Sequence, residues 1–132
     1  MIFIDSGAFL ARYHRADQYH LEAVEKWRLL ADGTLRAFTS NLVVLETVEL
    51  LARRLSYTFA AERARHIFST EEVTILRPDA EDERAAISVF EKYADSRISF
   101  TDSVSCILMR RNRLKRVFGF DRHFTRMGFE FF

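Results

Sequence analysis

The sequence predicts an α/β domain in which a parallel sheet is covered by helices on both faces. Short apolar runs, typical of buried strands, alternate with longer segments whose apolar residues recur at helical spacing. The 132 residues suit one domain, and the chain has neither internal repeats nor linkers rich in Gly, Ser or Pro. We therefore expect residues 1–132 to form a single α/β unit.

The first third of the chain predicts two strands and the helices between them. The apolar run IFID ends at Asp5 and continues directly into the helical stretch SGAFLARYH, which is typical of a buried strand that turns into a helix. A second helix is expected within 16–33, where Asp17 can cap the start and Gly33 can end it. The stretch LRAFTS, 35–40, predicts the second strand.

The middle of the chain predicts three more helices around one strand. Segments 41–55 and 56–70 have helical spacing, with Asn41 as a candidate cap for the first. The β-branched run EVTILRP, 72–78, predicts a strand that ends at the only proline. Acidic residues crowd the start of the next helix, within 79–95, where they complement the helix dipole.

The last third predicts one long helix and two late strands. The stretch ISFTDSVSCILMRR, 98–111, has Thr and Asp before an apolar run, as helix starts do, so Asp102 can be an ordinary cap. The runs RVFGFD and FEFF predict strands on either side of a short helical segment, RHFTRMG. Strands that alternate with helices indicate a parallel sheet.

The charge balance and the cysteine content limit the classes of function. The formal net charge is only +1, so no global field draws this chain to nucleic acid, and any such binding needs a local basic patch. The single cysteine, Cys106, cannot form an internal disulfide. We see no basic leader and no apolar run of roughly 18 residues, so we expect a soluble cytoplasmic protein.

Four carboxylates lie where the predicted fold can gather them. Asp5 and Asp121 follow strands, Asp102 begins a helix, and Glu46 lies inside one. In an open parallel sheet, ligands bind beyond the carboxyl ends of the strands, near a switch in strand order. The same edge of the sheet can therefore hold all four.

Some acids of the chain have an ordinary helical partner, and some do not. Glu49 has Arg53 four residues downstream, and Glu22 and Glu25 have Lys26 and Arg28 within reach. Glu46 and Asp102 have no basic residue at three or four positions downstream. An unpaired buried carboxylate is costly, and clustering raises its proton affinity unless a cation neutralises it. Caps and ordinary helix acids remain the alternative to a metal site.

The donor chemistry favours Mg²⁺ or Mn²⁺. Carboxylates are hard oxygen ligands, and none of His14, His20, His66 and His123 shows the paired spacing of zinc ligands. Such a site normally completes its coordination with water and a substrate phosphate. Two metals roughly 4 Å apart can clamp a phosphoryl group for in-line displacement, which is nuclease or phosphatase chemistry.

Four motifs carry a resemblance to a known family. They are FIDSGAFLA around Asp5, TSNLVVLETVELL around Glu46, ISFTDSVSCILMRR around Asp102, and VFGFDRHFTRMGF around Asp121. Each motif is weak alone, but in this order and spacing the chain resembles, from end to end, the PIN-domain ribonucleases and especially the VapC-like toxins of type II toxin-antitoxin modules. The resemblance implies a PIN fold, an α/β/α sandwich on a five-stranded parallel sheet, over residues 1–132.

The resemblance also implies an activity and its residues. It implies a Mg²⁺- or Mn²⁺-dependent endoribonuclease that acts on tRNA, rRNA or mRNA, pairs with a cognate antitoxin and forms a homodimer. Its water nucleophile would leave 5′-phosphate and 3′-hydroxyl ends. The positions that match the family's metal ligands are Asp5, Glu46, Asp102 and Asp121. Ser6 and Thr101 match small hydroxyl positions that place water or an acid in the site.

Several basic and aromatic residues are weaker candidates for RNA contact. The densest basic run contains Arg110, Arg111, Arg113 and Lys115, which can bind phosphate or can simply suit a helix C-terminus. Further candidates with an ordinary alternative are Arg12 and Arg122 for phosphate, Asp95 for a peripheral ligand, and Tyr13, Tyr19 and Trp27 for base stacking.

Two rival functions stay open at this point. An aspartate-nucleophile phosphatase usually has a second Asp two residues after the first, where this chain has Gly7. A non-catalytic PIN-like RNA- or protein-binding module would keep the fold without the chemistry, and the intact acidic quartet argues against it.

Overall fold

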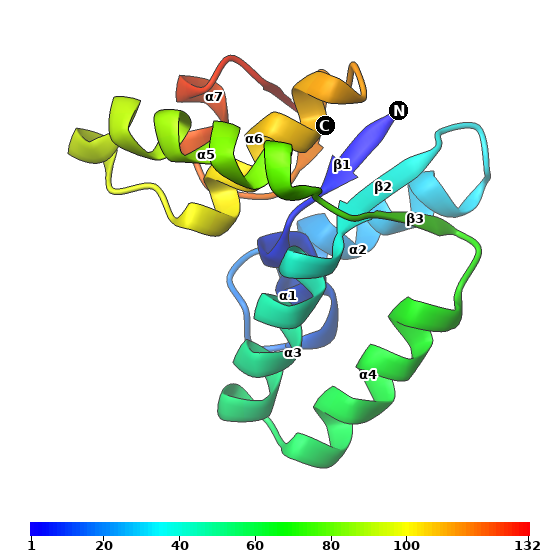
Figure 1. Ribbon diagram of the computed structural model, residues 1–132. Helices are drawn as coiled ribbons and strands as arrows, with labels where there is room; N and C mark the ends of the chain where they lie inside the picture. The colour runs from blue at the N-terminus through cyan, green and yellow to red at the C-terminus, as the bar shows by residue number, and fades with distance from the viewer.

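The computed structural model describes residues 1–132 as a five-stranded sheet with helices on both sides, which confirms the predicted fold class (Figure 1). In chain order the elements are β1 (Ile2–Ile4), α1 (Ser6–Tyr13), α2 (His20–Ala31), β2 (Ala37–Ser40), α3 (Asn41–Arg54), α4 (Tyr57–Ser69), β3 (Val73–Leu76), α5 (Ala80–Lys92), the 3₁₀ helix η1 (Ala94–Ser96), α6 (Phe100–Arg111), β4 (Arg116–Phe118), α7 (His123–Arg126) and β5 (Glu130–Phe131). None of the helices is long and apolar enough to cross a membrane.

The strand order creates a switch point beside the first strand. All neighbouring strands are parallel, in the order β3-β2-β1-β4-β5. The chain moves outward from β1 to β3 and then returns to add β4 on the other side of β1. The loops after β1 and β4 therefore leave the sheet in different directions, which opens a crevice at their carboxyl ends. Figure 1 shows α5, α6 and α7 on one side of the strands, and α1, α3 and α4 on the other.

The core explains why the central strand is a continuous apolar run. Ile2, Phe3 and Ile4 are fully buried because helices cover both faces of a parallel sheet. Phe118 of β4 is buried beside them. The only tryptophan, Trp27, packs from α2 and donates its indole N–H to the carbonyl of Ala8 at 3.1 Å. The sheet and both helical layers share this core, which holds the ends of β1 and β4 in place.

Two predicted helix caps are wrong. Ser40, not Asn41, caps α3: β2 runs into the helix without a loop, so the last strand residue is still extended and accepts the N–H of Val43 at 3.1 Å. Asp17 does not cap α2, which begins three residues later and has no side-chain cap. Its carboxylate instead accepts the N–H of Tyr19 at 2.8 Å within the preceding turn.

The predicted ion pairs form in one helix but not in the other. In α2, Lys26 lies 2.8 Å from Glu22, and Arg28 lies 3.1 Å from Glu25. In α3, Glu49 and Arg53 form no ion pair, although four residues separate them. Exposed pairs at this spacing gain only about 0.3–0.5 kcal/mol, so spacing alone does not hold the two side chains together.

Candidate functional site

A cleft lies at the switch point between β1 and β4. It has a volume of about 800 Å³, and its lining includes Asp5 and Ser6 after β1 and Phe120 and Asp121 after β4. The rest of its wall comes from α1, the turn before α2, the end of α3, and the segments that contain η1 and α7. The cleft is therefore built from segments that lie far apart in the sequence.

Asp5 is the most constrained acid of the cleft. Its backbone N–H donates to the carbonyl of Phe118 at 2.9 Å, and its Oδ2 accepts the N–H of Gly7 at 3.4 Å as the cap of α1. Its Oδ1 is buried and has no hydrogen-bond partner. Burial, followed by the charge of Asp102, raises the pKa of Asp5 from its ordinary 3.8 to about 7. The result is a carboxyl group that lacks a counter-charge.

The backbone at Gly119, directly after β4, lies close to the side chain of Asp5. A Cβ added at Gly119 would lie 3.0 Å from the Cβ of Asp5 and 3.4 Å from its Oδ2. Real Cβ atoms rarely come this close to another atom. Glycine at this position lets β4 support Asp5 without displacing it.

Asp102 has both a structural and an electrostatic role. It is the third residue of α6, where its N–H donates to the Ser99 hydroxyl at 3.0 Å and its Oδ2 accepts the Ser99 N–H at 3.2 Å. This is a capping box in which Ser99 is the cap residue and Asp102 is its partner in the first turn, so Asp102 takes part in the cap but is not the cap residue itself. Burial nevertheless raises the pKa of Asp102, more than the bonds from Ser99 lower it, and the charge of Asp121 adds to the rise.

Glu46 completes the acidic group from α3. It is half-buried in the middle of the helix, and its pKa is raised by burial and by the charge of Asp102, against the effect of the Ser6 hydroxyl beside it. The negative charge of Glu46 also raises the pKa of Asp5, so the two carboxyl groups are close enough to interact electrostatically. Thr101 is half-buried in the first turn of α6, next to Asp102.

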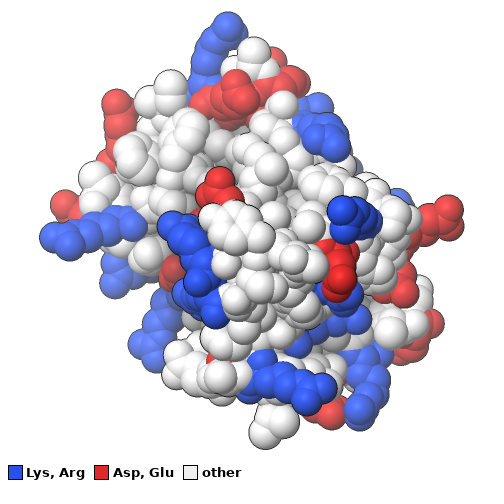
Figure 2. Space-filling model, turned by 90° about the horizontal axis from the view of Figure 1, so that it is seen from below, with Lys and Arg blue, Asp and Glu red and all other residues white.

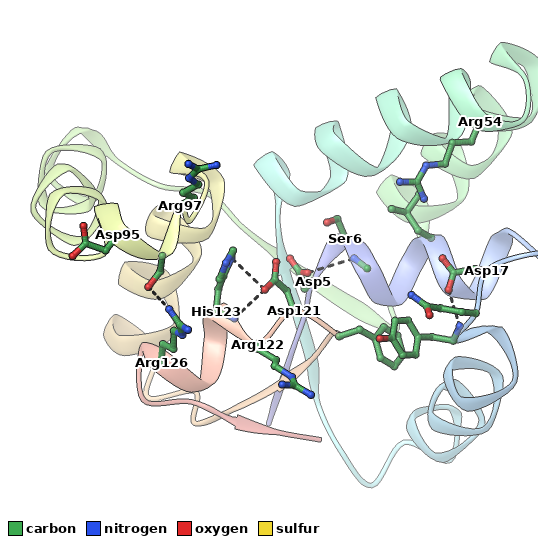
Figure 3. A pocket seen from close by; sticks show the side chains of 16 residues that line it. Asp5, Ser6, Asp17, Arg54, Asp95, Arg97, Asp121, Arg122, His123 and Arg126 are labelled. Atoms are coloured by element: carbon green, nitrogen blue, oxygen red, sulfur yellow. Dashed lines mark hydrogen bonds and ion pairs between the residues drawn. The ribbon is translucent and has the colours of Figure 1, made fainter.

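His123 lies beside Asp102 and Asp121, although no motif in the sequence pointed to it. Its Nδ1 lies 3.2 Å from Oδ1 of Asp121 and 3.7 Å from Oδ2 of Asp102, and it hydrogen-bonds to neither. One ligand atom from each of the three residues lies within 4.8 Å of the others. Figure 3 shows Asp121 and His123 side by side. The backbone N–H of His123 also holds the exposed Asp121 through its Oδ1 at 2.9 Å.

The residues present fit a divalent cation. The buried Oδ1 of Asp5 lacks any donor, and three neighbouring carboxyl groups have raised pKa values that a cation would reverse. The predominance of carboxylate oxygen favours Mg²⁺ or Mn²⁺, and the imidazole of His123 adds a nitrogen donor that Mn²⁺ accepts more readily than Mg²⁺. The ligand atoms that lie within 4.8 Å of one another belong to Asp102, Asp121 and His123, whereas Asp5 is linked to the acids Asp102 and Glu46 through the effect of their charges on its pKa.

Four arginines surround the acids at the rim of the cleft. They are Arg54 at the end of α3, Arg97 after η1, Arg122 before α7, and Arg126 in it. In the view of Figure 3, Arg97 and Arg126 lie on one side of the acids and Arg54 on the other. The sequence pointed only to Arg122, because the other three are separated in the chain and have no motif. On the face in Figure 2, acidic and basic groups are interspersed, without a continuous surface of one sign.

Most of the basic residues predicted to contact RNA lie outside the lining of the cleft. Arg12 stacks over the Trp27 ring at 4.4 Å, and Arg110 donates to the carbonyl of Met127 at 3.3 Å. Arg111 pairs with Asp79 and Asp82 at the start of α5. The remaining members, Arg113 and Lys115, are exposed between α6 and β4.

Of the weaker aromatic and acidic candidates, two lie in or against the core and two line the cleft. Trp27 is buried in the core and Tyr13 is half-buried against Phe9, so both have structural surroundings. Tyr19 and Asp95 are exposed and line the cleft.

Comparison with known proteins points to one family. The family model of the PIN domain matches residues 2–130. The crystal structure of VapC20 from Mycobacterium tuberculosis, a sarcin-ricin loop cleaving toxin, is 28% identical with a TM-score of 0.88, over 98% of this chain and 96% of that one. FitAcB from Neisseria gonorrhoeae is 16% identical with a TM-score of 0.69, over 100% and 96%, and supports the fold alone. A search of curated proteins gave no match.

Proposed function

The chain belongs to the PIN-domain family, and from this premise we propose that it is a Mg²⁺- or Mn²⁺-dependent endoribonuclease, the toxin of a toxin-antitoxin pair. One observation carries the proposal: buried acids that lack counter-charges lie together at the switch point of the sheet, and their field acts on Asp5. Such an arrangement destabilises the protein unless it binds a cation, so a function is the physical reason to keep it.

The side chains have distinct parts in the proposed reaction. Asp5, Glu46, Asp102 and Asp121 would hold the metal, which would supply activation of the attacking water and compensation of the phosphate charge. Ser6, through its hydroxyl, orients Glu46, and Thr101 is the proposed water-positioning group beside Asp102. The rim arginines bind the RNA phosphates that flank the site.

No side chain needs to act as the nucleophile. Water attacks the phosphorus and the ribose 3′-oxygen leaves, so each cut yields a 5′-phosphate and a 3′-hydroxyl end. Attack by the ribose 2′-hydroxyl would instead leave a cyclic phosphate. The product ends therefore report the attacking group.

The likeness to VapC20 suggests the substrate and the partner. Because that toxin cleaves the sarcin-ricin loop, we propose rRNA as the first substrate class for this chain, with tRNA and mRNA as the others. A cognate antitoxin that covers the acidic cleft would silence the enzyme, and we propose a cytoplasmic homodimer. The basic residues Arg12, Arg110, Arg111, Arg113 and Lys115 remain proposed RNA contacts outside the cleft.

The decisive experiment is cleavage of defined RNAs by the purified protein. A sarcin-ricin hairpin and a tRNA are incubated with Mg²⁺, with Mn²⁺ or with a chelator, and product ends are mapped. We expect metal-dependent cuts with 5′-phosphate ends, which Asp102→Asn abolishes. Asp82→Asn is the matched control, since Asp82 has the same place in the capping box of α5. RNA that binds but stays intact with either metal would favour the alternative, a non-catalytic PIN-like RNA- or protein-binding module.

A further inference from the structure

A stacked pair of aromatic side chains lines the acidic cleft. The rings of Tyr19 and Phe120 have centroids 4.3 Å apart and planes only 2° from parallel. Phe120 is half-buried, whereas Tyr19 is 38% exposed. Both belong to the lining of the cleft that contains Asp5 and Asp121. The pair is therefore an apolar surface, open on one side, in a cleft whose lining residues are mostly polar.

The backbone and the neighbouring side chains hold this pair in place. The Tyr19 N–H donates to Asp17 at 2.8 Å, and the ring Nδ1 of the next residue, His20, lies 2.7 Å from the carbonyl of Ala11. Phe120 packs edge-on against Phe118, with centroids 6.2 Å apart. The rings are thus positioned before any ligand arrives, which limits the entropy lost on stacking.

The pair lies immediately beside the proposed reaction centre. Gly7 lies next to both the ring of Phe120 and the carboxylate of Asp5. A Cβ added at Gly7 would lie 3.8 Å from Cδ2 of Phe120 and 3.7 Å from Oδ2 of Asp5. Across the cleft, Arg126 donates to the Ser96 hydroxyl at 2.6 Å, and Arg97 lies on the same side (Figure 3). Cations for phosphate and rings for a base therefore flank the same acids.

Building on the proposed nuclease function, we propose that Tyr19 and Phe120 form a stacking platform for an unpaired base next to the phosphate at Asp5. Nucleotides combine a flat aromatic base with a phosphate, and proteins bind single strands through aromatic rings beside cationic grooves. A duplex keeps its bases stacked on each other, so the platform selects loops, ends and bases turned out of a helix. The arginine rim favours this polyanion over a peptide that brings its own cations.

Binding of two probes of equal charge tests the platform. The probes are a short fluorescent oligoadenylate and an abasic backbone with the same number of phosphates, measured in Mg²⁺ by anisotropy. All proteins carry Asp102→Asn so that the probe stays intact. We expect the parent to bind oligoadenylate more tightly than the abasic strand, and Tyr19→Ala to lower oligoadenylate affinity roughly tenfold with little change for the abasic strand.

Two further variants separate stacking from other effects. Tyr19→Phe keeps the ring and should restore the preference for bases. Tyr57→Ala removes a tyrosine that is 80% exposed at the start of α4, outside the cleft, and should change neither affinity. Unfolding curves confirm that each variant folds. Equal affinity of the parent for both probes, or failure of Tyr19→Phe to restore the preference, overturns the platform.

The two proposals fail in different ways. If the wild type cleaves RNA but Tyr19→Ala binds oligoadenylate normally, the platform is wrong, the nuclease stands, and a side chain of a protein partner becomes the candidate occupant. If base-dependent binding through Tyr19 is present but no RNA is ever cut, the nuclease proposal is wrong and the chain is an RNA-binding module.

Discussion

Helices α5 and α6 both begin with a capping box, but the acid of one box has a basic partner and the acid of the other has an acidic neighbour. Asp82 in α5 and Asp102 in α6 are both the third helical residue of a capping box, and they are 5% and 9% exposed. Each accepts the backbone N–H of its cap residue, Asp82 from Asp79 at 3.0 Å and Asp102 from Ser99 at 3.2 Å. Their local structures are nearly identical.

The surroundings of the two carboxylates differ. Asp82 pairs with Arg111 of α6, so its charge is compensated within the protein. Asp102 instead has Asp121 as an acidic neighbour, and burial raises its pKa. A capping motif therefore does not reveal whether the charge of its acid is compensated. For Asp82 the protein supplies an arginine, and for Asp102 we propose that a bound cation supplies the compensating charge.

The largest expected effect concerns the pH dependence of the metal-free protein. The folded state holds a proton on Asp5 up to a pKa of about 7, whereas the unfolded chain releases it near 3.8. This contribution to stability is present below pH 3.8 and is lost as the pH rises through 7. Urea unfolding in chelator should show a decrease on the order of 4 kcal/mol at most. Asp5→Asn should remove the contribution of Asp5 to this decrease and leave that of Glu46 and Asp102, whose pKa values are also raised. Asp95→Asn should leave the profile unchanged. A wild-type profile already flat from pH 4 to 8 contradicts the burial argument.

The stabilisation of the fold by a bound metal should depend on Asp102 and not on Asp82, which tests the difference between the two capping boxes most directly. A ligand of the folded state at 100 times its dissociation constant adds about 2.7 kcal/mol, so Mn²⁺ should raise the midpoint of thermal unfolding. We expect Asp102→Asn to lose this gain and Asp82→Asn to keep it. Equal loss in both variants would mean that the comparison between the two acids is mistaken.

The compensated acid should matter for stability and not for activity. Asp82→Asn weakens a charge-assisted bond to Arg111, whose side chain is 55% exposed, so the free energy of unfolding should fall by only about 1–2 kcal/mol. RNA cleavage per folded molecule should stay at the wild-type level. Arg111→Gln should have a similar effect on stability. A large loss of cleavage in Asp82→Asn would show that α5 also acts on the site.

The smallest effect tests the support of Asp5 by β4. In Gly119→Ala, the new methyl must displace Asp5, whose backbone is fixed by Phe118, so cleavage should fall about tenfold. Gly7→Ala is the matched variant, because its methyl would lie at an ordinary contact distance of 3.7 Å from Asp5. Its loss of cleavage should be clearly smaller. Equal losses would mean that the spacing at Gly119 is not what positions Asp5.

Sequence reasoning succeeds where the information is local and fails where it depends on packing. The alternation of apolar runs and helical segments predicted the parallel sheet, which the structure confirms. The assignment of Asp5, Glu46, Asp102 and Asp121 as metal ligands stays a prediction. The caps at Asn41 and Asp17 failed because tight connections decide which residue stays extended.

The arginines and His123 were missed for a different reason. Arg54, Arg97 and Arg126 come from three distant segments, and only the folded chain brings them to one rim. Conversely, the basic run from Arg110 follows Asp102 in sequence, but the helix rises 1.5 Å per residue and carries it roughly 12 Å away from the acids.

The hydrogen bond from Asp5 to Phe118 also affects the order in which the chain folds during its synthesis. It joins the first strand to a strand that is made more than a hundred residues later, and contacts that close such long loops form late because their entropy cost is high. Local helices can form on the growing chain while the acidic cleft is still divided between its two ends. The acidic cleft is therefore complete only after β4 has left the ribosome and paired with β1.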